Sequence, residues 1–275
     1  MFSSCKWGPT MASRYDEMES QLKTLTGSGV RSKIINQLQD GPKGAPDLAS
    51  HLGASVTTIL HALKTLSDDG TVQRCSGGYE LTHVGQLKSL LLKEMIDGLA
   101  TLSENGKFWQ SHDISGIPVH LQARLGKLAG GICIEDEPNN LLKSQAVFIE
   151  NVSKAKKIWG VSPIIAPGYS DMITSLIDGG ATVSLILTTS IICIVGRRVI
   201  QDWLAMENFH LFEIPDGIKV AFTVTDDALF LGLYNLDGTY DALRNLVCNG
   251  QDAVYWGMEL FEFYLKQSRP VQSIT

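Results

Sequence analysis

The stretch LASHLGASVTT at residues 48–58 decides the fold of the N-terminal part of the chain. Its first five residues place apolar side chains at helical spacing, which predicts a short helix. Gly53 then supplies a tight turn, and Ser55 can cap a following helix by accepting hydrogen bonds from the free amides of its first turn. The stretch therefore predicts two helices that are joined by a tight turn.

The sequence on either side extends this pattern. Residues 30–38 repeat apolar side chains at helical spacing, which indicates a further helix ahead of the quoted stretch. The helix that Ser55 caps is expected to end at Asp68-Asp69-Gly70. Two extended runs follow at residues 71–75 and 79–82, and the Ser-Gly-Gly between them predicts a hairpin.

Helix, helix, tight turn, helix and hairpin is the order of a winged helix-turn-helix. Residues 48–58 and the segment Gly-Tyr-Glu-Leu-Thr-His-Val-Gly at 78–85 resemble winged-helix transcription regulators of the ArsR/MarR kind. The first resembles the turn and the start of the recognition helix, and the second resembles the return strand and exit of the wing. The resemblance implies that residues 21–82 bind double-stranded DNA, with residues 1–20 as an N-terminal extension.

An α-helix fits the major groove of DNA, where its outward side chains reach the base edges. The candidate DNA-binding residues on the recognition helix are Ser55, Val56, Thr57, Leu60, His61 and Lys64. Arg74 in the wing would contact backbone phosphate. This set is less basic than usual, which favours either a modest affinity or a dimer that doubles the contacts. A winged helix that contacts protein is the alternative.

Charge is distributed unevenly along the chain. Residues 1–100 hold 10 Lys+Arg and 10 Asp+Glu, whereas residues 101–275 hold 13 and 19. An acidic surface repels DNA, so any DNA contact is expected from the N-terminal part. The five cysteines are scattered without a C-x-x-C pair, and none lies between residues 6 and 74. The sequence thus predicts isolated thiols, no metal sensing and no cofactor.

Residues 83–104 predict a long helix that is apolar over much of its circumference. The apolar positions are Val84, Leu87, Leu90, Leu91, Leu92, Met95, Ile96, Leu99 and Leu102. Such a helix must bury a second face. The same helix of another subunit would cover it in a homodimer, and the chain's own C-terminal domain is the alternative.

Residues 105–268 alternate between helical and extended patterns, which predicts a mixed α/β domain. Helices are expected at 146–157, 169–177 and 252–266, and briefly from Tyr240. A further helix, capped by Thr189 or Ser190, is expected to run through Arg197, Arg198 and Trp203. Extended segments are expected at 158–165, 182–187, 218–225 and 228–234. No G-x-G-x-x-G, Walker or G-x-S-x-G pattern occurs, and no catalytic set is visible. The sequence therefore favours a non-enzyme.

Four phrases in this segment resemble the middle domain of the archaeal methanogenesis-regulator family. They are Gly-Ile-Pro (116–118), Trp-Gly-Val-Ser-Pro-Ile (159–164), Leu-Gly-Leu-Tyr-Asn-Leu-Asp-Gly-Thr-Tyr-Asp (231–241) and Trp-Gly-Met-Glu-Leu-Phe-Glu-Phe-Tyr (256–264). This resemblance implies a regulatory, effector-sensing domain. A more distant likeness is to a degenerate phospholipase-D-like fold. Its chemistry needs a His-x-Lys pair, and none of the six histidines is followed two residues later by Lys.

Ligands of open α/β sheets bind outside the carboxyl ends of the strands, where aromatic and polar residues cluster in this chain. The candidate ligand-binding residues are Trp159, Ser162, Tyr169, Asp226, Tyr234, Asp237, Tyr240, Asp241 and Trp256. The alternative places Trp159, Tyr234 and Trp256 in the core and Asp237 in a turn.

These observations predict a dimeric, DNA-binding transcription regulator that responds to an unknown small-molecule effector. The longest apolar-leaning run, residues 181–196, is too short and too polar to cross a membrane, and the start lacks the apolar core of a signal peptide. A cytoplasmic protein with no membrane partner is therefore expected. The alternatives are an enzyme that uses Asp226-Asp227 and Asp237 to Asp241, and a protein-interaction adaptor.

Overall fold

The structure, a computed structural model, describes residues 11–273 of the chain. The chain divides into two compact units with the boundary between Ile96 and Asp97. Residues 1–10, half of the predicted N-terminal extension, lie outside the described residues. The remainder of that segment enters helix α1 (Met11–Thr26).

The first unit contains the predicted succession of helices and hairpin. Its elements after α1 are α2 (Gly29–Gln37), the 3-10 helix η1 (Leu38–Asp40), α3 (Ala45–Leu52), α4 (Val56–Asp68), β1 (Val72–Cys75) and β2 (Gly78–Leu81). Gly53 ends α3 in the left-handed conformation with φ 60°. The Ser55 hydroxyl accepts a hydrogen bond from the Thr58 amide at 3.1 Å and so caps α4. Apolar side chains of α2, α3 and α4 form one core.

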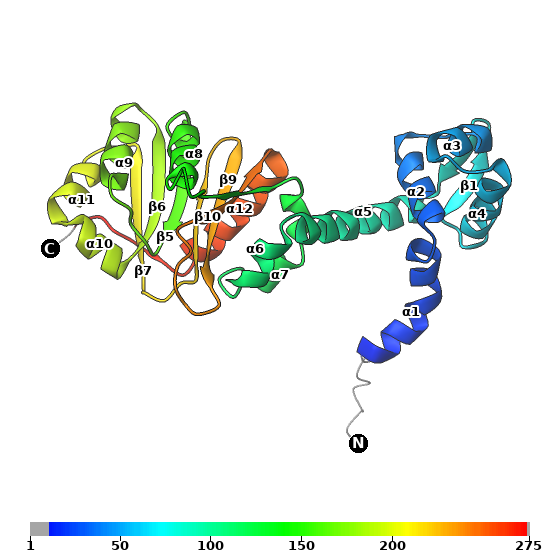
Figure 1. The fold of residues 1–275 in the computed structure, drawn as a ribbon, viewed down its shortest axis with the longest axis horizontal. Helices are drawn as coiled ribbons and strands as arrows, with labels where there is room; N and C mark the ends of the chain where they lie inside the picture. Colours follow the sequence, from blue (N-terminus) through cyan, green and yellow to red (C-terminus); the bar gives the residue numbers. More distant parts are fainter. Residues whose placement is uncertain (1–10, 274–275) are drawn as a thin grey trace, which may run out of the picture. The chain divides into compact units, whose positions relative to one another are not determined.

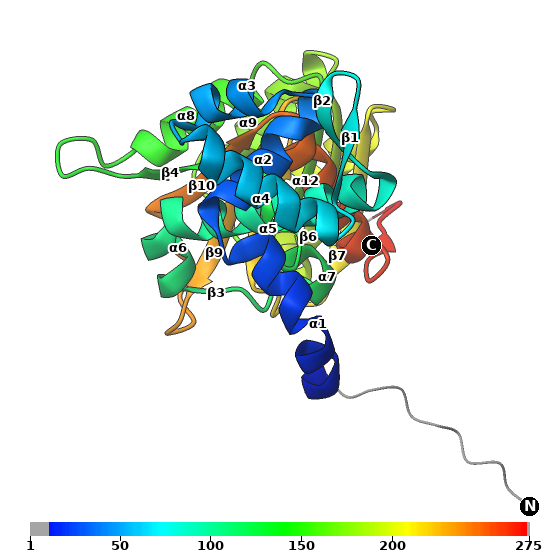
Figure 2. The same ribbon diagram turned by 90° about the vertical axis from the view of Figure 1, so that its right-hand side faces the viewer.

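The hairpin β1–β2 is anchored at its base by a close backbone approach. Figure 2 shows it at the edge of the first unit. Lys43 and Tyr79 exchange two backbone hydrogen bonds of 3.0 Å, which attach the segment before α3 to β2. A Cβ at Gly78 would lie 2.5 Å from the Lys43 carbonyl oxygen, so only glycine fits there. Gly78 belongs to β2 and pairs with Cys75, which leaves Ser76 and Gly77 as the turn.

Helix α5 (His83–Glu104) is continuous across the boundary between the units (Figure 1). It forms over the residues that the sequence predicts. Polar Ser89 and Thr101 on this helix are buried, whereas most of its large apolar side chains are exposed.

The second unit is built on one mixed sheet. Its helical elements are α6 (Gly106–Ser111), α7 (Val119–Gln122), the 3-10 helix η2 (Leu125–Leu128), α8 (Lys143–Val152), α9 (Tyr169–Asp178), α10 (Thr189–Val195), α11 (Arg197–Leu204) and α12 (Gln251–Leu265). Its strands are β3 (His112–Asp113), β4 (Ile132–Glu135), β5 (Lys157–Ser162), β6 (Thr182–Thr188), β7 (Phe209–Ile214), β8 (Val220–Val224), β9 (Ala228–Asn235), β10 (Arg244–Asn249) and β11 (Arg269–Pro270).

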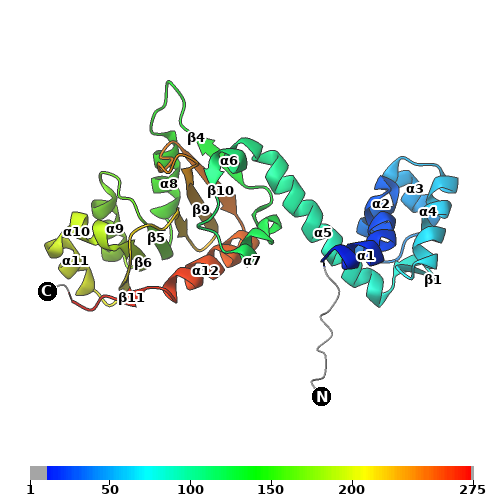
Figure 3. The same cartoon turned by 90° about the horizontal axis from the view of Figure 1, so that it is seen from below.

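In the part of the chain that the structure describes, the strand order is β11-β7-β6-β5-β8-β9-β10-β4, and β3 pairs with β9. Strands β5, β6 and β7 are parallel, and the other pairings are antiparallel. Helix α12 covers one face, whereas α8 and α9 cover the other (Figure 3). The predicted mixed α/β architecture is confirmed for this unit.

Several local expectations need correction. The helix expected through Arg197 is two helices, because Gly196 between them adopts a positive φ of 89°. The short helix expected from Tyr240 is wrong: the chain there enters β10, which pairs with both β9 and β4. Its burial alternates, with Leu246 and Cys248 inside, and this period of two is that of a strand. Strand β7 was not expected at all.

The cysteines differ sharply in their expected reactivity. Cys75, Cys133, Cys193 and Cys248 are free thiols. Burial raises the pKa of the Cys248 thiol to about 12, whereas Cys193 is exposed. Because the thiolate is the reactive form, iodoacetamide at pH 8 is expected to label Cys193 and to spare Cys248 in the native protein. Mass spectrometry of peptides measures this. Equal labelling of both before denaturation would contradict the burial of Cys248.

Candidate functional site

The outward face of α4 is the first candidate site. Ile59, Ala62, Leu63 and Leu66 of this helix are buried. The predicted outward set is exposed throughout: Ser55, Val56, Thr57, Leu60, His61 and Lys64. The structure thus brings these side chains together on one exposed helix face with Ser55 at its N-terminus.

Arg74 lies on the exposed side of the hairpin and stacks over the ring of Tyr79, 5.6 Å from its centroid. Tyr79 was missed from sequence, although the hairpin register places it directly opposite Arg74. A cation stacked on an aromatic ring loses part of its rotamer freedom. The guanidinium therefore remains on the surface of the hairpin, where an anion could accept hydrogen bonds from its N–H groups.

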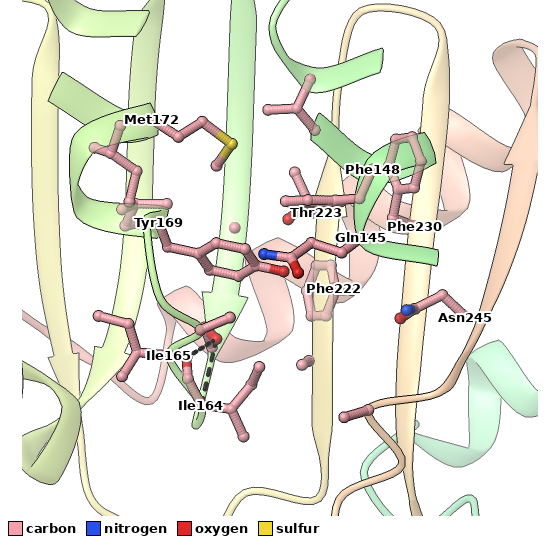
Figure 4. Close-up of a pocket in the computed structure, with 18 of the residues that line it drawn as sticks. Gln145, Phe148, Ile164, Ile165, Tyr169, Met172, Phe222, Thr223, Phe230 and Asn245 are labelled. Atoms are coloured by element: carbon pink, nitrogen blue, oxygen red, sulfur yellow. Dashed lines mark hydrogen bonds between the residues drawn. The ribbon is translucent and has the colours of Figure 1, made fainter. Parts of the chain in front are cut away.

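The second candidate site is a cavity of about 320 Å³ in the second unit. It lies between α8 and α9 on one side and strands β5, β6, β8, β9 and β10 on the other. The loop after β5 contributes Ile164, Ile165 and Ala166 to the lining, so the cavity adjoins the carboxyl end of a parallel strand, as expected for an open α/β sheet. Figure 4 shows its large apolar side chains, which include Phe148, Ile164, Ile165, Met172, Phe222 and Phe230.

Polar side chains enter this cavity from different elements. The Tyr169 ring and the Gln145 amide point into the same space (Figure 4). Tyr240 and Thr223 also contribute to the lining. Burial raises the pKa values of the Tyr169 and Tyr240 phenols, and a negative charge on Tyr169 would raise that of Tyr240 further. Both phenols therefore stay protonated and can donate a hydrogen bond.

Ser162, Tyr169 and Tyr240 of the predicted ligand-binding set line the cavity. Ser162 is already engaged, since its hydroxyl donates to the Ile164 carbonyl at 2.6 Å. Tyr240 reaches the sheet because residue 232 is glycine, where any Cβ would collide with the Tyr240 hydroxyl.

The aromatic part of the prediction needs correction, because three of these residues lie outside the cavity lining. The Trp256 indole is fully buried and donates to the Leu121 carbonyl at 3.0 Å, so this residue belongs to the core. Trp159 packs against the cluster that contains α12, on the opposite face of the sheet. Tyr234 packs edge-on to the Tyr240 ring and lies beneath the Lys219 ammonium group.

Three acidic residues of the prediction also lie outside the lining and have structural partners. Asp226 accepts from the amides of Lys156 and Lys157 at the start of β5. Asp237 accepts from the amide and hydroxyl of Thr239 in a turn, and these bonds lower the pKa of the Asp237 carboxyl. The buried Asp241 accepts from Arg244 at 2.7 Å and contacts the His112 imidazole at 3.1 Å.

Sequence reasoning missed most of the cavity's polar lining. Gln145 and Thr223 carry no motif, and the expected helix began one residue after Gln145. Thr223 is the polar residue of β8 among Val, Ala and Phe, which is the sequence signal that could have found it, and it is the partly exposed position of that strand. Among the described residues, no group of His, Cys, Asp and Glu could hold a metal ion.

Known proteins resemble both units. Residues 19–100 match the N-terminal domain of the methanogenesis regulatory protein FilR1, and residues 142–267 match its middle domain. A curated relative, the methanogenesis regulatory protein FilR1 of Methanothrix harundinacea (strain 6Ac), is 32% identical over 260 residues. Both units of the chain are therefore similar to parts of FilR1 regulatory proteins. The match covers 92% of this chain and 58% of that FilR1 protein.

Solved structures resemble this chain only loosely. TrmBL2, described as an archaeal chromatin protein with a novel mode of DNA binding, is 16% identical, with a TM-score of 0.43 over 93% of this chain and 99% of TrmBL2. Nuc of Salmonella typhimurium, a phospholipase D family member, is 15% identical, with a TM-score of 0.39 over 52% of this chain and 99% of Nuc. No helix in the described part of the chain is long and apolar enough to span a membrane.

Proposed function

We propose that this protein belongs to the FilR1 family and is a transcription regulator that binds double-stranded DNA as a homodimer through a winged helix-turn-helix and senses a small-molecule effector in its second unit. The observation that carries the proposal is the exposed outward face of α4. Apolar residues anchor this helix from behind, and Ser55 caps its N-terminus. This leaves one helix face free to enter a major groove.

The residue types on that face favour contacts with base edges over electrostatic contacts with phosphate. Thr57 and His61 can exchange hydrogen bonds with base edges, and Val56 and Leu60 can contact thymine methyl groups. Lys64 and Arg74 supply the cations for phosphate. Two cations from each copy give a weak electrostatic contribution, so a single copy would bind modestly and a dimer is favoured.

Helix α5 supports the dimer. Val84, Leu87, Leu91, Met95 and Leu102 follow one stripe at intervals of three, four or seven residues, and all are exposed. The stripe extends about 27 Å at 1.5 Å per residue. Full burial of a fully exposed apolar side chain of this size contributes about 1.5–3 kcal/mol. The five side chains are 41–71% exposed, so the ten from two copies contribute about 8–16 kcal/mol, which is comparable to an association cost of about 4–15 kcal/mol.

The cavity supports the effector role. It has the volume of a small-molecule site, and its walls are mostly apolar with a few convergent polar groups. The acidic residues that an enzyme would need have other partners, since Asp226 caps a strand and Asp241 is ion-paired. We infer that the effector occupies this cavity and acts on the DNA-binding unit through α5.

DNase I footprinting on the protein's own promoter tests the proposed function. A dimer with twofold symmetry is expected to protect an inverted repeat whose half-sites are about 34–36 Å, or one duplex turn, apart. An excess of unlabelled duplex that carries the same repeat should abolish this protection, whereas competitor DNA of unrelated sequence should leave it in place. Absence of any protected inverted repeat near that promoter would contradict the proposal.

A further inference from the structure

The lining of the cavity is free of cationic side chains. Its described residues include no Lys, Arg or His. Asp136 is the acidic residue among them, and its carboxylate already accepts a hydrogen bond of 2.7 Å from the Ser144 amide. An anionic ligand would therefore lose its hydration without gaining a counter-ion, which is strongly unfavourable in a buried site.

The rim of the cavity is apolar as well. Leu142 is 65% exposed and Leu141 is 68% exposed, and both contribute to the lining. Ile164 and Ile165, in the loop after β5, add further apolar lining. A polyol such as a sugar would leave many of its hydroxyls without partners against these walls, at a cost for each unpaired group.

A small set of polar groups remains available for one end of a ligand. Within the described residues, the side chains of Gln145, Tyr169, Thr223 and Tyr240 form no hydrogen bond, although all four line the cavity. Tyr169 and Tyr240 lie near enough that a charge on one raises the pKa of the other. Two phenols and an amide can bind a carbonyl, hydroxyl or amide group without any formal charge.

We propose that the effector is an uncharged, predominantly apolar small molecule with one compact polar group, which binds among Gln145, Tyr169 and Tyr240. This inference rests on the proposed role of the cavity as the effector site. The apolar body would lie against the aromatic and aliphatic walls, with its polar group at the phenols. Phosphorylated metabolites, carboxylates and sugars are excluded as effectors.

Isothermal titration of the full chain with three probes tests the inference. The probes are 2-naphthamide, 2-naphthoate and maltose, of which the first two share one ring system and differ in charge. We expect 2-naphthamide to bind with at least about tenfold higher affinity than 2-naphthoate, because only the carboxylate carries a charge into a site without a counter-ion. Maltose is expected to give no heat of binding. Equal affinity for amide and carboxylate, binding of maltose, or no binding of 2-naphthamide up to its solubility limit would each overturn the inference.

Substitutions at the cavity test whether 2-naphthamide binds there. Leu142→Asp puts a charge on the rim at an exposed position, where folding is not at risk, and is expected to weaken 2-naphthamide binding at least about fivefold. Val119→Asp is the matched control, since Val119 is 78% exposed and lies outside the lining. The double variant Tyr169→Phe with Gln145→Leu loses two of the polar groups. Its affinity for 2-naphthamide relative to that for a neutral hydrocarbon such as 2-methylnaphthalene should therefore be smaller than that of the wild type. If Leu142→Asp and Val119→Asp bind 2-naphthamide equally well, the probe binds elsewhere and the inference fails.

The titration contains no DNA, so its outcome is independent of the outcome of the footprinting experiment. A protein that protects its inverted repeat but fails with 2-naphthamide remains a DNA-binding regulator with a different ligand or none. A protein that binds 2-naphthamide but protects no repeat has an apolar-ligand site and a different function.

Discussion

Charge reversal at both Lys64 and Arg74 is expected to weaken binding to the protected inverted repeat by about 100-fold or more. Lys64 is exposed on α4, and Arg74 is held on the wing by its stacking on Tyr79. In a dimer, the double variant replaces four cations near phosphate with four carboxylates, so attraction becomes repulsion at each contact. A loss of 100-fold corresponds to about 2.8 kcal/mol, which is within the range of a few phosphate and base contacts.

Fluorescence anisotropy of a labelled duplex measures this effect, at two or more salt concentrations. The dependence of affinity on salt should become shallower, because fewer counter-ions are released. The matched control is Lys107→Glu with Lys154→Glu, which changes the net charge equally but lies in the second unit at exposed positions. If both double variants lose affinity to the same extent, overall charge and not the α4 surface accounts for binding. Unchanged affinity in the Lys64 and Arg74 variant would favour the adaptor alternative.

The double substitution Leu87→Glu and Leu91→Glu is expected to convert a dimer into monomers. Leu87 is 63% exposed and Leu91 is 71% exposed on the α5 stripe, so neither supports the fold of its own unit. In a paired stripe the four new carboxylates would be buried against apolar side chains and against each other, which is far more costly than the loss of the leucines. Loss of the dimer should weaken DNA binding about as much as loss of one half-site.

Sedimentation equilibrium at micromolar concentration reads out the subunit number. Gln86→Glu with Ser103→Glu is the matched control, since it adds two carboxylates to the same helix at exposed positions off the stripe. That control should remain dimeric. A wild-type protein that sediments as a monomer at these concentrations would contradict the proposed dimer and the expectation of two half-sites.

Local sequence signals were strong enough to place the first unit. The inward positions of α4 are at helical spacing. Gly53 ends α3 in the left-handed conformation that favours glycine, and Ser55 caps the N-terminus of α4. These are interactions between residues a few positions apart. The pairing of Arg74 with Tyr79 is also local, but it depends on a register that follows from whether Gly78 belongs to the turn or to the strand. The structure decides it through the long-range bond between Lys43 and Tyr79.

The cavity could not be placed in the same way, because its walls come from segments about 100 residues apart. Trp256 and Trp159 looked like ligand residues since aromatic residues serve both cores and sites, and only the face of the sheet separates the two roles. Asp241 looked available, yet His112 and Arg244 reach it through the pairing of β3 with β9 and the local course of the chain. Residue type indicates what a side chain can do, whereas tertiary topology decides which partners are near.

The two buried phenols have a consequence for the signal that this protein would read. Because burial raises the pKa values of Tyr169 and Tyr240, neither phenol is expected to change its protonation between about pH 6 and 9, and the described lining holds no histidine. Occupancy would then depend on how much effector the cell contains and would be indifferent to acidification of the surrounding medium. In an organism whose metabolism acidifies its own environment, the effector occupancy of such a receptor would stay the same at a given effector concentration.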